Sequence, residues 1–126
     1  MPKQVHEAPS GPEPLGPYSI VTEAAGLVFV SGMIAIDPAT GAAVAGGTAP
    51  QAEQVMRNIG SVLDDVGLSY DDIVKTTIFV TDIDDFPIVN DVYASFVGDA
   101  PPARSTVEVA ALPGGFVVEI ETIAAR

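Results

Sequence analysis

The sequence predicts a two-layer α+β domain in which helices cover one face of a mixed sheet. Valine and isoleucine together outnumber leucine 27 to 5, a β-branched bias that is typical of a strand-rich core. Two segments carry apolar residues at helical spacing, and the other apolar segments have the length of strands. The elements follow one another in the order ββαβαββ. A length of 126 residues and 48% hydrophobic residues indicate one domain spanning residues 1–126.

The chain begins with a proline-rich segment, because five of the 11 prolines lie within the first 17 residues. Proline lacks a backbone N–H and restrains the residue before it, so we expect residues 1–16 to be extended and irregular. Residues 19–23 and 27–31 are predicted to form two strands joined by a short turn, which makes a hairpin. The glycine-rich residues 37–47 indicate a loop.

Two helices are predicted, and each has end signals. The first covers residues 48–66, with Thr48 as its N-cap, Gln51 completing a capping box and Gly67 in the left-handed position after the last turn. The second begins at a capping Asp84 and ends at Gly98. One face of this second helix is apolar and carries Phe86, Val89, Tyr93 and Phe96.

Three more strands are predicted over residues 73–81, 104–110 and 117–124, the last two separated by a turn at residues 112–115. In the first of these, strand alternation puts one set of side chains on one face (Val74, Thr76, Ile78 and Val80) and another set on the opposite face (Thr77 and Phe79). Both faces therefore carry apolar groups. A sheet with helices on one face only then needs a second cover, and self-association is the simplest one.

The charge of the chain bears on its partners. Five Lys and Arg stand against 17 Asp and Glu, which gives a formal net charge of −12. Only Arg57, Lys75 and Arg104 lie away from the two ends of the chain, and three scattered cations form no basic stripe for a phosphate backbone. We therefore expect no nucleic-acid partner.

The composition excludes several site classes. The chain has no cysteine and a single histidine, His6, so it can form no disulfide, thiolate zinc site or multi-histidine metal cluster. We also expect no Ser–His–Asp triad, because His6 lies in the proline-rich segment. Acidic pairs at residues 64–65, 71–72 and 82–85 lack the glycine and terminal glutamate of a calcium loop, and we expect no metal. No apolar run has the length of a membrane span or a secretory leader, so we expect a cytoplasmic protein without a membrane partner.

Four side chains are candidates for chemistry. Arg104 begins a predicted strand, where its guanidinium either binds a ligand carboxylate or pairs with one of the 17 acids. Glu119 lies in an apolar strand and is either exposed at an edge or a proton-transfer group with a raised pKa. Tyr18 can donate a hydrogen bond to a ligand or pack, and Asn90 in mid-helix weakly indicates a partner outside its helix.

The order of these residues resembles the RidA family, the reactive intermediate/imine deaminases that are also called YjgF and are related to the liver perchloric-acid-soluble proteins. The resemblance runs from about residue 16 to residue 126. Its most specific part is the stretch PARSTVEVAAL followed by VEI. Its motifs lie at residues 16–19 (GPYS), 30–32 (VSG), 72–80 (DIVKTTIFV), 86–90 (FPIVN), 102–112 and 118–120.

The resemblance implies a chorismate-mutase-like fold assembled as a homotrimer, with three sheets forming a barrel and ligand sites in the clefts between subunits. It implies hydrolysis of 2-imino acids such as 2-iminobutanoate and 2-iminopropanoate to 2-keto acids and ammonia, without cofactor or metal. Arg104 matches the carboxylate-binding arginine and Glu119 the acid that orients or activates water. Tyr18 matches the tyrosine that lines the pocket and is counted with Arg104 and Glu119 as catalytic. The remaining substrate-binding positions match Ser31, Gly32, Asn90 and Thr106.

Three positions depart from the family pattern and keep alternatives open. Ile20 and Met33 replace glutamines that many members carry, and Thr106 replaces a cysteine, so no reactive thiol is present. The apolar substitutions make the surroundings of the site less polar and favour the alternative of a non-catalytic trimer that binds small carboxylates or partner proteins. An endoribonuclease, a third reading, is disfavoured by the scarcity of cations.

Overall fold

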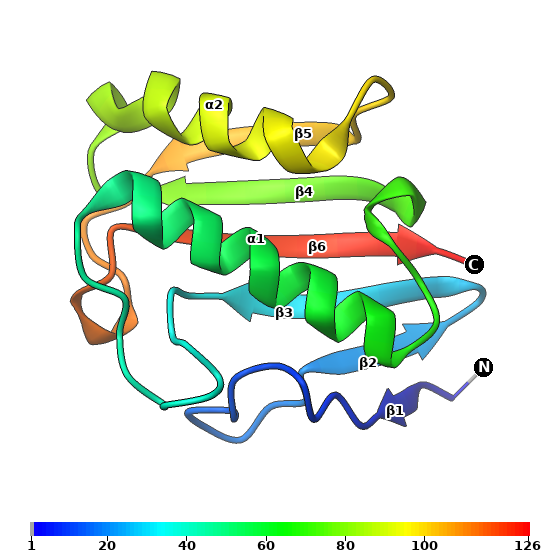
Figure 1. Cartoon of the computed structure of the whole chain (residues 1–126). Coiled ribbons are helices and arrows are strands. Elements are labelled where there is room, and N and C mark those ends of the chain that lie inside the picture. Colours follow the sequence, from blue (N-terminus) through cyan, green and yellow to red (C-terminus); the bar gives the residue numbers. More distant parts are fainter. Residues whose placement is uncertain (1) are drawn as a thin grey trace.

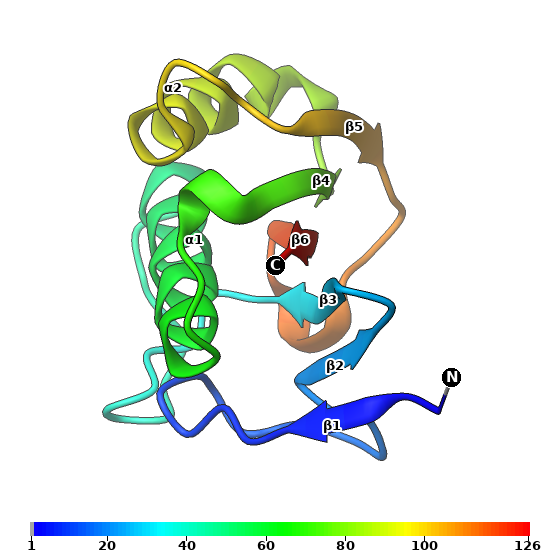
Figure 2. The same cartoon turned by 90° about the vertical axis from the view of Figure 1, so that its right-hand side faces the viewer.

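Two helices pack against one face of a six-stranded sheet in this computed structural model, which describes residues 2–126 (Figures 1 and 2). The helices are α1 (Thr48–Asp65) and α2 (Phe86–Val97), and the strands are β1 (Gln4–His6), β2 (Val21–Ala24), β3 (Leu27–Met33), β4 (Ile73–Val80), β5 (Ala103–Glu108) and β6 (Val118–Ala125). The predicted two-layer α+β class is thus confirmed. The five predicted strands lie within two residues of their observed bounds.

The sheet has the strand order β1-β2-β3-β6-β4-β5. All neighbouring strands are antiparallel except β4 and β5, which are parallel and are connected through α2. The sheet is therefore mixed, as predicted. The last strand of the chain, β6, lies in the middle, and β5 forms one edge next to α2 (Figure 1).

The core lies between the helices and the inner face of the sheet. Helix α1 contributes an apolar stripe that is fully or almost fully buried (Ala52, Val55, Met56, Ile59, Val62 and Leu63). Alternate residues of β6 meet it from the sheet (Val118, Ile120, Thr122 and Ala124). Burying one such aliphatic side chain stabilises a fold by roughly 1.5–3 kcal/mol, so the stripe fixes the helix on the sheet. No helix in residues 2–126 is long and apolar enough to cross a membrane.

The predicted capping box of α1 is wrong. Gly47 is the N-cap, and Thr48 is the first helical residue. The Thr48 hydroxyl donates to the Asp85 carboxylate at 2.7 Å, and the Gln51 side-chain oxygen accepts from the Val117 amide at 2.9 Å. Both side chains therefore join α1 to other elements instead of closing its own first turn.

The predicted cap of α2 is also wrong. Asp84 lies in a short 3₁₀ turn before the helix, and its amide donates to the Asp82 side chain at 2.9 Å. Asp85 occupies the N-cap position without a side-chain capping bond. The predicted glycines at the C-terminal ends of the helices are confirmed, because Gly67 and Gly98 follow α1 and α2 with φ of 78° and 69°.

The prediction that Val74 shares a face of the sheet with Thr76 is wrong, because β4 begins with a bulge. The register between β4 and β6 shifts between Ile73 and Lys75, so Ile73 is buried and Val74 is 45% exposed. Val74 therefore does not share the inner face with Thr76 and the residues after it. Apolar groups nevertheless remain on the uncovered outer face, where Leu27, Phe29, Val74 and Val107 are exposed.

The N-terminal segment contains a strand that the sequence did not predict. Gln4–His6 pairs with β2, so the expectation of an irregular segment is wrong over these residues. They lie between Pro2 and Pro9 and keep every backbone N–H that a strand needs. Further along, the amide and hydroxyl of Ser10 donate to the Asp65 carboxylate at 2.8 and 2.7 Å, which attaches the segment to the end of α1.

Candidate active site

Arg104 lies beside two aromatic rings. It is the second residue of β5, and its Cα pairs in register with Thr76 of β4, so its side chain lies on the helix side of the sheet. The guanidinium carbon is 5.3 Å from the ring centroid of Phe86 and 5.2 Å from that of Tyr93. These distances are within cation–π range.

The N–H donors of the Arg104 guanidinium are free in the part of the chain that the structure describes. Within residues 2–126, Arg104 has no hydrogen-bond or ion-pair partner, so the alternative of an internal ion pair does not hold in the chain itself. The other two arginines differ, because Arg57 pairs with Glu53 at 3.3 Å and Arg126 with Glu23 at 2.9 Å. A planar guanidinium with free donors matches a carboxylate.

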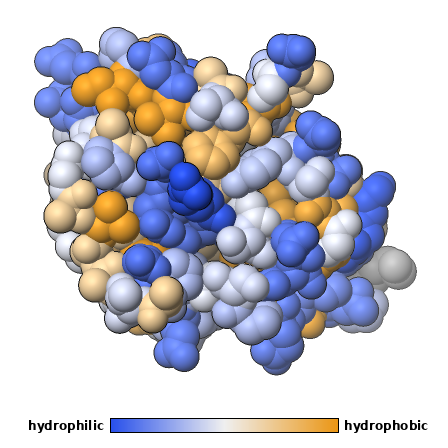
Figure 3. Space-filling view, in the orientation of Figure 1, coloured by the Kyte–Doolittle hydropathy of each residue, from blue (hydrophilic) through white to orange (hydrophobic). Residues whose placement is uncertain are grey.

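A pocket of about 400 Å³ adjoins Arg104 and is bounded by Asn90, Tyr93 and the chain at 98–102. The side-chain oxygens of Asn90 and Thr106 are buried and have no partner among the described residues. Buried polar atoms are normally satisfied, so both oxygens indicate a missing hydrogen-bond partner. Figure 3 shows apolar surface near the start of α2, and the exposed apolar residues of this region are Ile83, Phe86 and Ile88.

Glu119 lies on the other face of the sheet. Its neighbours in β6, Val118 and Ile120, are fully buried in the core, so alternation directs Glu119 to the outer face. Burial raises its pKa, and the nearby Glu121 carboxylate raises it further. A Cβ added to Gly32 would collide with the Glu119 carboxylate and come within 2.8 Å of its Cδ, so only glycine leaves room for it here.

Tyr18 and Ser31 lie beside Gly32, the residue that approaches this carboxylate. The Tyr18 hydroxyl accepts from the Leu15 amide at 3.1 Å, and its side chain is partly exposed. The Ser31 hydroxyl donates to the Ser19 carbonyl at 2.6 Å. Tyr18 and Gly32 also line one small crevice, so these residues and Glu119 form a second cluster.

The two departures expected to alter the pocket lie behind this cluster. Ile20 and Met33 line the same small crevice as Tyr18, and Met33 is only 2% exposed. Both are packed in or against the hydrophobic core. Their side chains therefore make the wall of this crevice apolar.

The predicted site residues thus form two clusters, which one chain does not bring together. Arg104, Asn90 and Thr106 lie at the β5 edge beside α2, and the Glu119 cluster lies on the outer face of β6 and β3. Strand β4 separates Arg104 from Glu119, and their side chains leave the sheet on opposite faces. One small molecule cannot contact both residues of the same chain.

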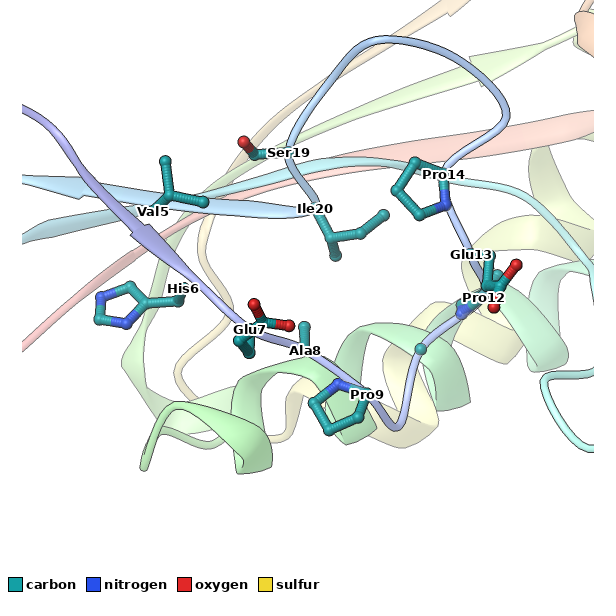
Figure 4. A pocket seen from close by; sticks show the side chains of 11 residues that line it. Val5, His6, Glu7, Ala8, Pro9, Pro12, Glu13, Pro14, Ser19 and Ile20 are labelled. Carbon is teal, nitrogen blue, oxygen red and sulfur yellow. The ribbon is translucent and has the colours of Figure 1, made fainter.

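A different pocket, of about 390 Å³, lies between β1, the loop after it and residues 19–20 (Figure 4). Ile20 points into it and Ser19 points away. Glu7 and Glu13 contribute its charge, and none of the predicted site residues lines it. The described residues contain no group of three or more His, Asp or Glu that could hold a metal ion.

Sequence reasoning missed the ring partners of Arg104. Phe86 and Tyr93 are seven residues apart on α2, a spacing that placed them on an apolar helix face. Tyr93 is indeed buried, but its ring also contacts the guanidinium. The sequence carries no signal for the approach of β5 to this face, because that approach depends on the parallel pairing of β4 and β5.

Comparison with known proteins places this geometry in a family. Residues 8–126 match the family described as endoribonuclease L-PSP. The chain is 44% identical over 122 residues to Reactive Intermediate Deaminase A of Arabidopsis thaliana, covering 97% of this chain and 65% of that protein. It is 40% identical to the 2-iminobutanoate/2-iminopropanoate deaminase of Bos taurus, covering 98% and 90% of the two chains. The crystal structure of the Rid-family protein YyfA from Yersinia pestis superposes with a TM-score of 0.94 at 47% identity, over 99% of this chain and 100% of that one.

Proposed function

This chain belongs to the RidA (YjgF, endoribonuclease L-PSP) family, and we propose that it hydrolyses reactive 2-imino acids to 2-keto acids and ammonia. The observation that carries the proposal is the guanidinium of Arg104, which lies within cation–π distance of two aromatic rings and has no partner for its donors within residues 2–126. It matches the carboxylate common to all 2-imino acids. Relatives at about 40% identity carry the names of 2-imino acid deaminases, which supports this substrate class.

The chemistry requires positioning and proton transfer. An imine carbon is already electrophilic, so a water molecule can add to it once the substrate is held. In this proposal Arg104 holds the carboxylate, and Glu119 accepts a proton from the attacking water. The water oxygen bonds to the imine carbon and the proton passes to the imine nitrogen, which gives a carbinolamine. Its hydroxyl proton then passes through Glu119 to the nitrogen, the C–N bond breaks as the C=O bond forms, and ammonia leaves a 2-keto acid. The raised pKa of Glu119 suits a group that accepts and returns a proton.

We also propose that the working unit is a homotrimer whose sites combine residues of two subunits. The two clusters of one chain lie on opposite faces of the sheet, so a complete site needs the Arg104 cluster of one chain and the Glu119 cluster of another. The exposed apolar residues of the outer face support this assembly. In such a site Tyr18, Ser31 and Gly32 stand with Glu119, and Asn90 and Thr106 stand with Arg104.

A catalytic test separates the deaminase from a non-catalytic carboxylate binder. With 2-iminopropanoate generated in situ and trapped by a scavenging amine, the wild type should accelerate imine loss. Arg104→Ala should lower kcat/KM about 100-fold, because truncating one partner of a charged hydrogen-bonded pair costs roughly 2–5 kcal/mol. Glu119→Gln should lower kcat more than it weakens binding.

Arg57→Ala is the matched control, since it removes an arginine whose only partner within residues 2–126 is Glu53 of its own helix. It should leave turnover within about two-fold. Saturable binding of a 2-keto acid without any turnover would instead establish the non-catalytic alternative. RNA cleavage that persists through stringent purification and in Arg104→Ala would establish the ribonuclease that the family description names.

A further inference from the structure

The geometry points to Tyr93 as a positioning residue that orients the guanidinium of Arg104 for its ligand, an inference that rests on the proposed function. The Tyr93 ring is 5% exposed, and its centroid is 5.2 Å from the guanidinium carbon. Its hydroxyl is hydrogen-bonded to the Thr76 hydroxyl at 2.7 Å. Tyr93 is therefore held at both ends, by the helix backbone and by the sheet.

Thr76 anchors this tyrosine to β4, the strand that pairs with the one carrying the arginine. It is 1% exposed, and its Cα is the register partner of Arg104 across the parallel β4–β5 pair. The position of the ring is thus fixed by the residue next to Arg104 on the same face of the sheet. Phe86, on the same face of α2, is 37% exposed and has no such anchor.

Ring contacts orient an arginine differently from an ion pair. An internal carboxylate would occupy N–H donors and compete with the ligand, whereas an aromatic ring attracts the cation through its π face. The N–H donors in the guanidinium plane then stay free for bidentate binding. Burial raises the pKa of the Tyr93 hydroxyl, which favours a neutral ring at physiological pH.

The first readout needs neither ligand nor turnover. Ring currents should shift the Nε–H resonance of Arg104 upfield in the free wild-type protein, and Arg104→Lys identifies this signal among the three arginines of the chain. Tyr93→Leu should move the signal toward the position of an unstacked arginine. Tyr93→Phe keeps the ring and should preserve most of the shift.

The second readout is binding of the stable product-like ligand 2-oxobutanoate. Tyr93→Leu should raise its Kd about ten-fold, the effect of losing one partly desolvated cation–π contact, and should raise KM more than it lowers kcat. Tyr93→Phe should restore Kd to within about three-fold of the wild type, since only the hydroxyl anchor is lost. In an Arg104→Lys background, Tyr93→Leu should cost less than in the wild type, because the planar group that it orients is gone.

Tyr70 provides the matched control. Its hydroxyl donates to the Met56 carbonyl at 2.6 Å, and its ring packs against Phe96, so it is a second hydrogen-bonded tyrosine, partly buried against the core. Tyr70→Leu should lower stability but leave the Arg104 resonance and the Kd unchanged. An unshifted Arg104 resonance in the wild type, equal effects of the two leucine variants, or an unchanged Kd in Tyr93→Leu would each overturn the positioning role.

Failure of the proposed function would look different. A wild type that neither binds 2-oxobutanoate nor hydrolyses the imine rejects the deaminase. The ring-current shift and its loss in Tyr93→Leu would then still decide whether Tyr93 orients Arg104.

Discussion

The ionised Glu119 carboxylate lowers the stability of the folded chain. Its pKa is raised by burial and by Glu121, so the folded state binds its proton more tightly than the unfolded state does. Between the unfolded pKa and the raised folded pKa, the free energy of unfolding therefore falls as pH increases. Above the raised folded pKa, Glu119 is ionised in both states and lowers the free energy of unfolding by its full amount.

Replacing this carboxylate should stabilise the protein in a pH-dependent way. We expect Glu119→Gln to raise Tm relative to the wild type at pH 7 and to change it far less at pH 4, where the folded wild type is largely protonated. Thermal unfolding at the two pH values measures the difference. Glu7→Gln, at an exposed glutamate, is the control. An equal change of Tm at both pH values for Glu119→Gln would contradict the burial argument.

At the scale of single residues, the sequence singled out candidate groups but did not predict where they lie. Arg104 was identifiable because interior cations are few, and Glu119 because it interrupts an apolar strand. Their separation onto opposite faces was not, because it depends on strand order and on the approach of β5 to α2. A contact such as that between Gly32 and Glu119 also depends on the bulge in β3.

At the scale of elements, repeated apolar patterns predicted the helices and strands correctly, whereas the predicted N-caps of both helices were wrong. The apolar stripe of α1 and the alternation of β6 are repeated signals, and both elements were predicted within a residue or so. Thr48 and Gln51 fit a capping box in sequence, but tertiary partners take their hydrogen bonds. The three-residue strand β1 is too short for any periodicity and is defined only by its pairing with β2.

Glu23 joins three elements at one end of the sheet. Its carboxylate, on β2, lies 2.7 Å from the His6 ring nitrogen of β1 and accepts from Arg126 at 2.9 Å. Arg126 also donates to the Val66 carbonyl at the end of α1, at 2.8 Å. The hydrogen bonds from Arg126 and His6 lower the pKa of Glu23.

Removing this carboxylate should loosen the N-terminal strand. We expect Glu23→Gln to speed amide hydrogen exchange across Gln4–His6 at pH 7, because both partners lose a charged acceptor. A depressed pKa adds stability above the unfolded pKa that is lost as pH falls through the folded one, so wild type and variant should converge in strongly acidic solution. Glu53→Gln, which removes a separate surface pair with Arg57, should leave β1 unchanged. Unaltered exchange in Glu23→Gln would show that the β1–β2 pairing alone holds the strand.

At the scale of the whole molecule, a composite site predicts complementation between inactive subunits. Arg104→Ala and Glu119→Gln trimers should each be nearly inactive. Mixed at equal amounts after unfolding and refolding together, they should recover about a quarter of wild-type activity, because each mixed cyclic trimer has one site with both native residues. Light scattering should confirm three subunits. Mixtures no more active than their parents would place the whole site within one chain.

The segment from β4 through α2 to β5 is continuous in sequence, spanning residues 73–108, and it contains Thr76, Phe86, Tyr93 and Arg104. The proposed anion-binding half of the site is therefore assembled by near neighbours in the chain and requires no second molecule. On this proposal, a newly folded subunit presents the Arg104 guanidinium before it meets another subunit. In a composite site, assembly with another subunit would then supply Glu119 as the proton-transfer group. A single subunit would therefore bind the 2-imino acid before it could hydrolyse it.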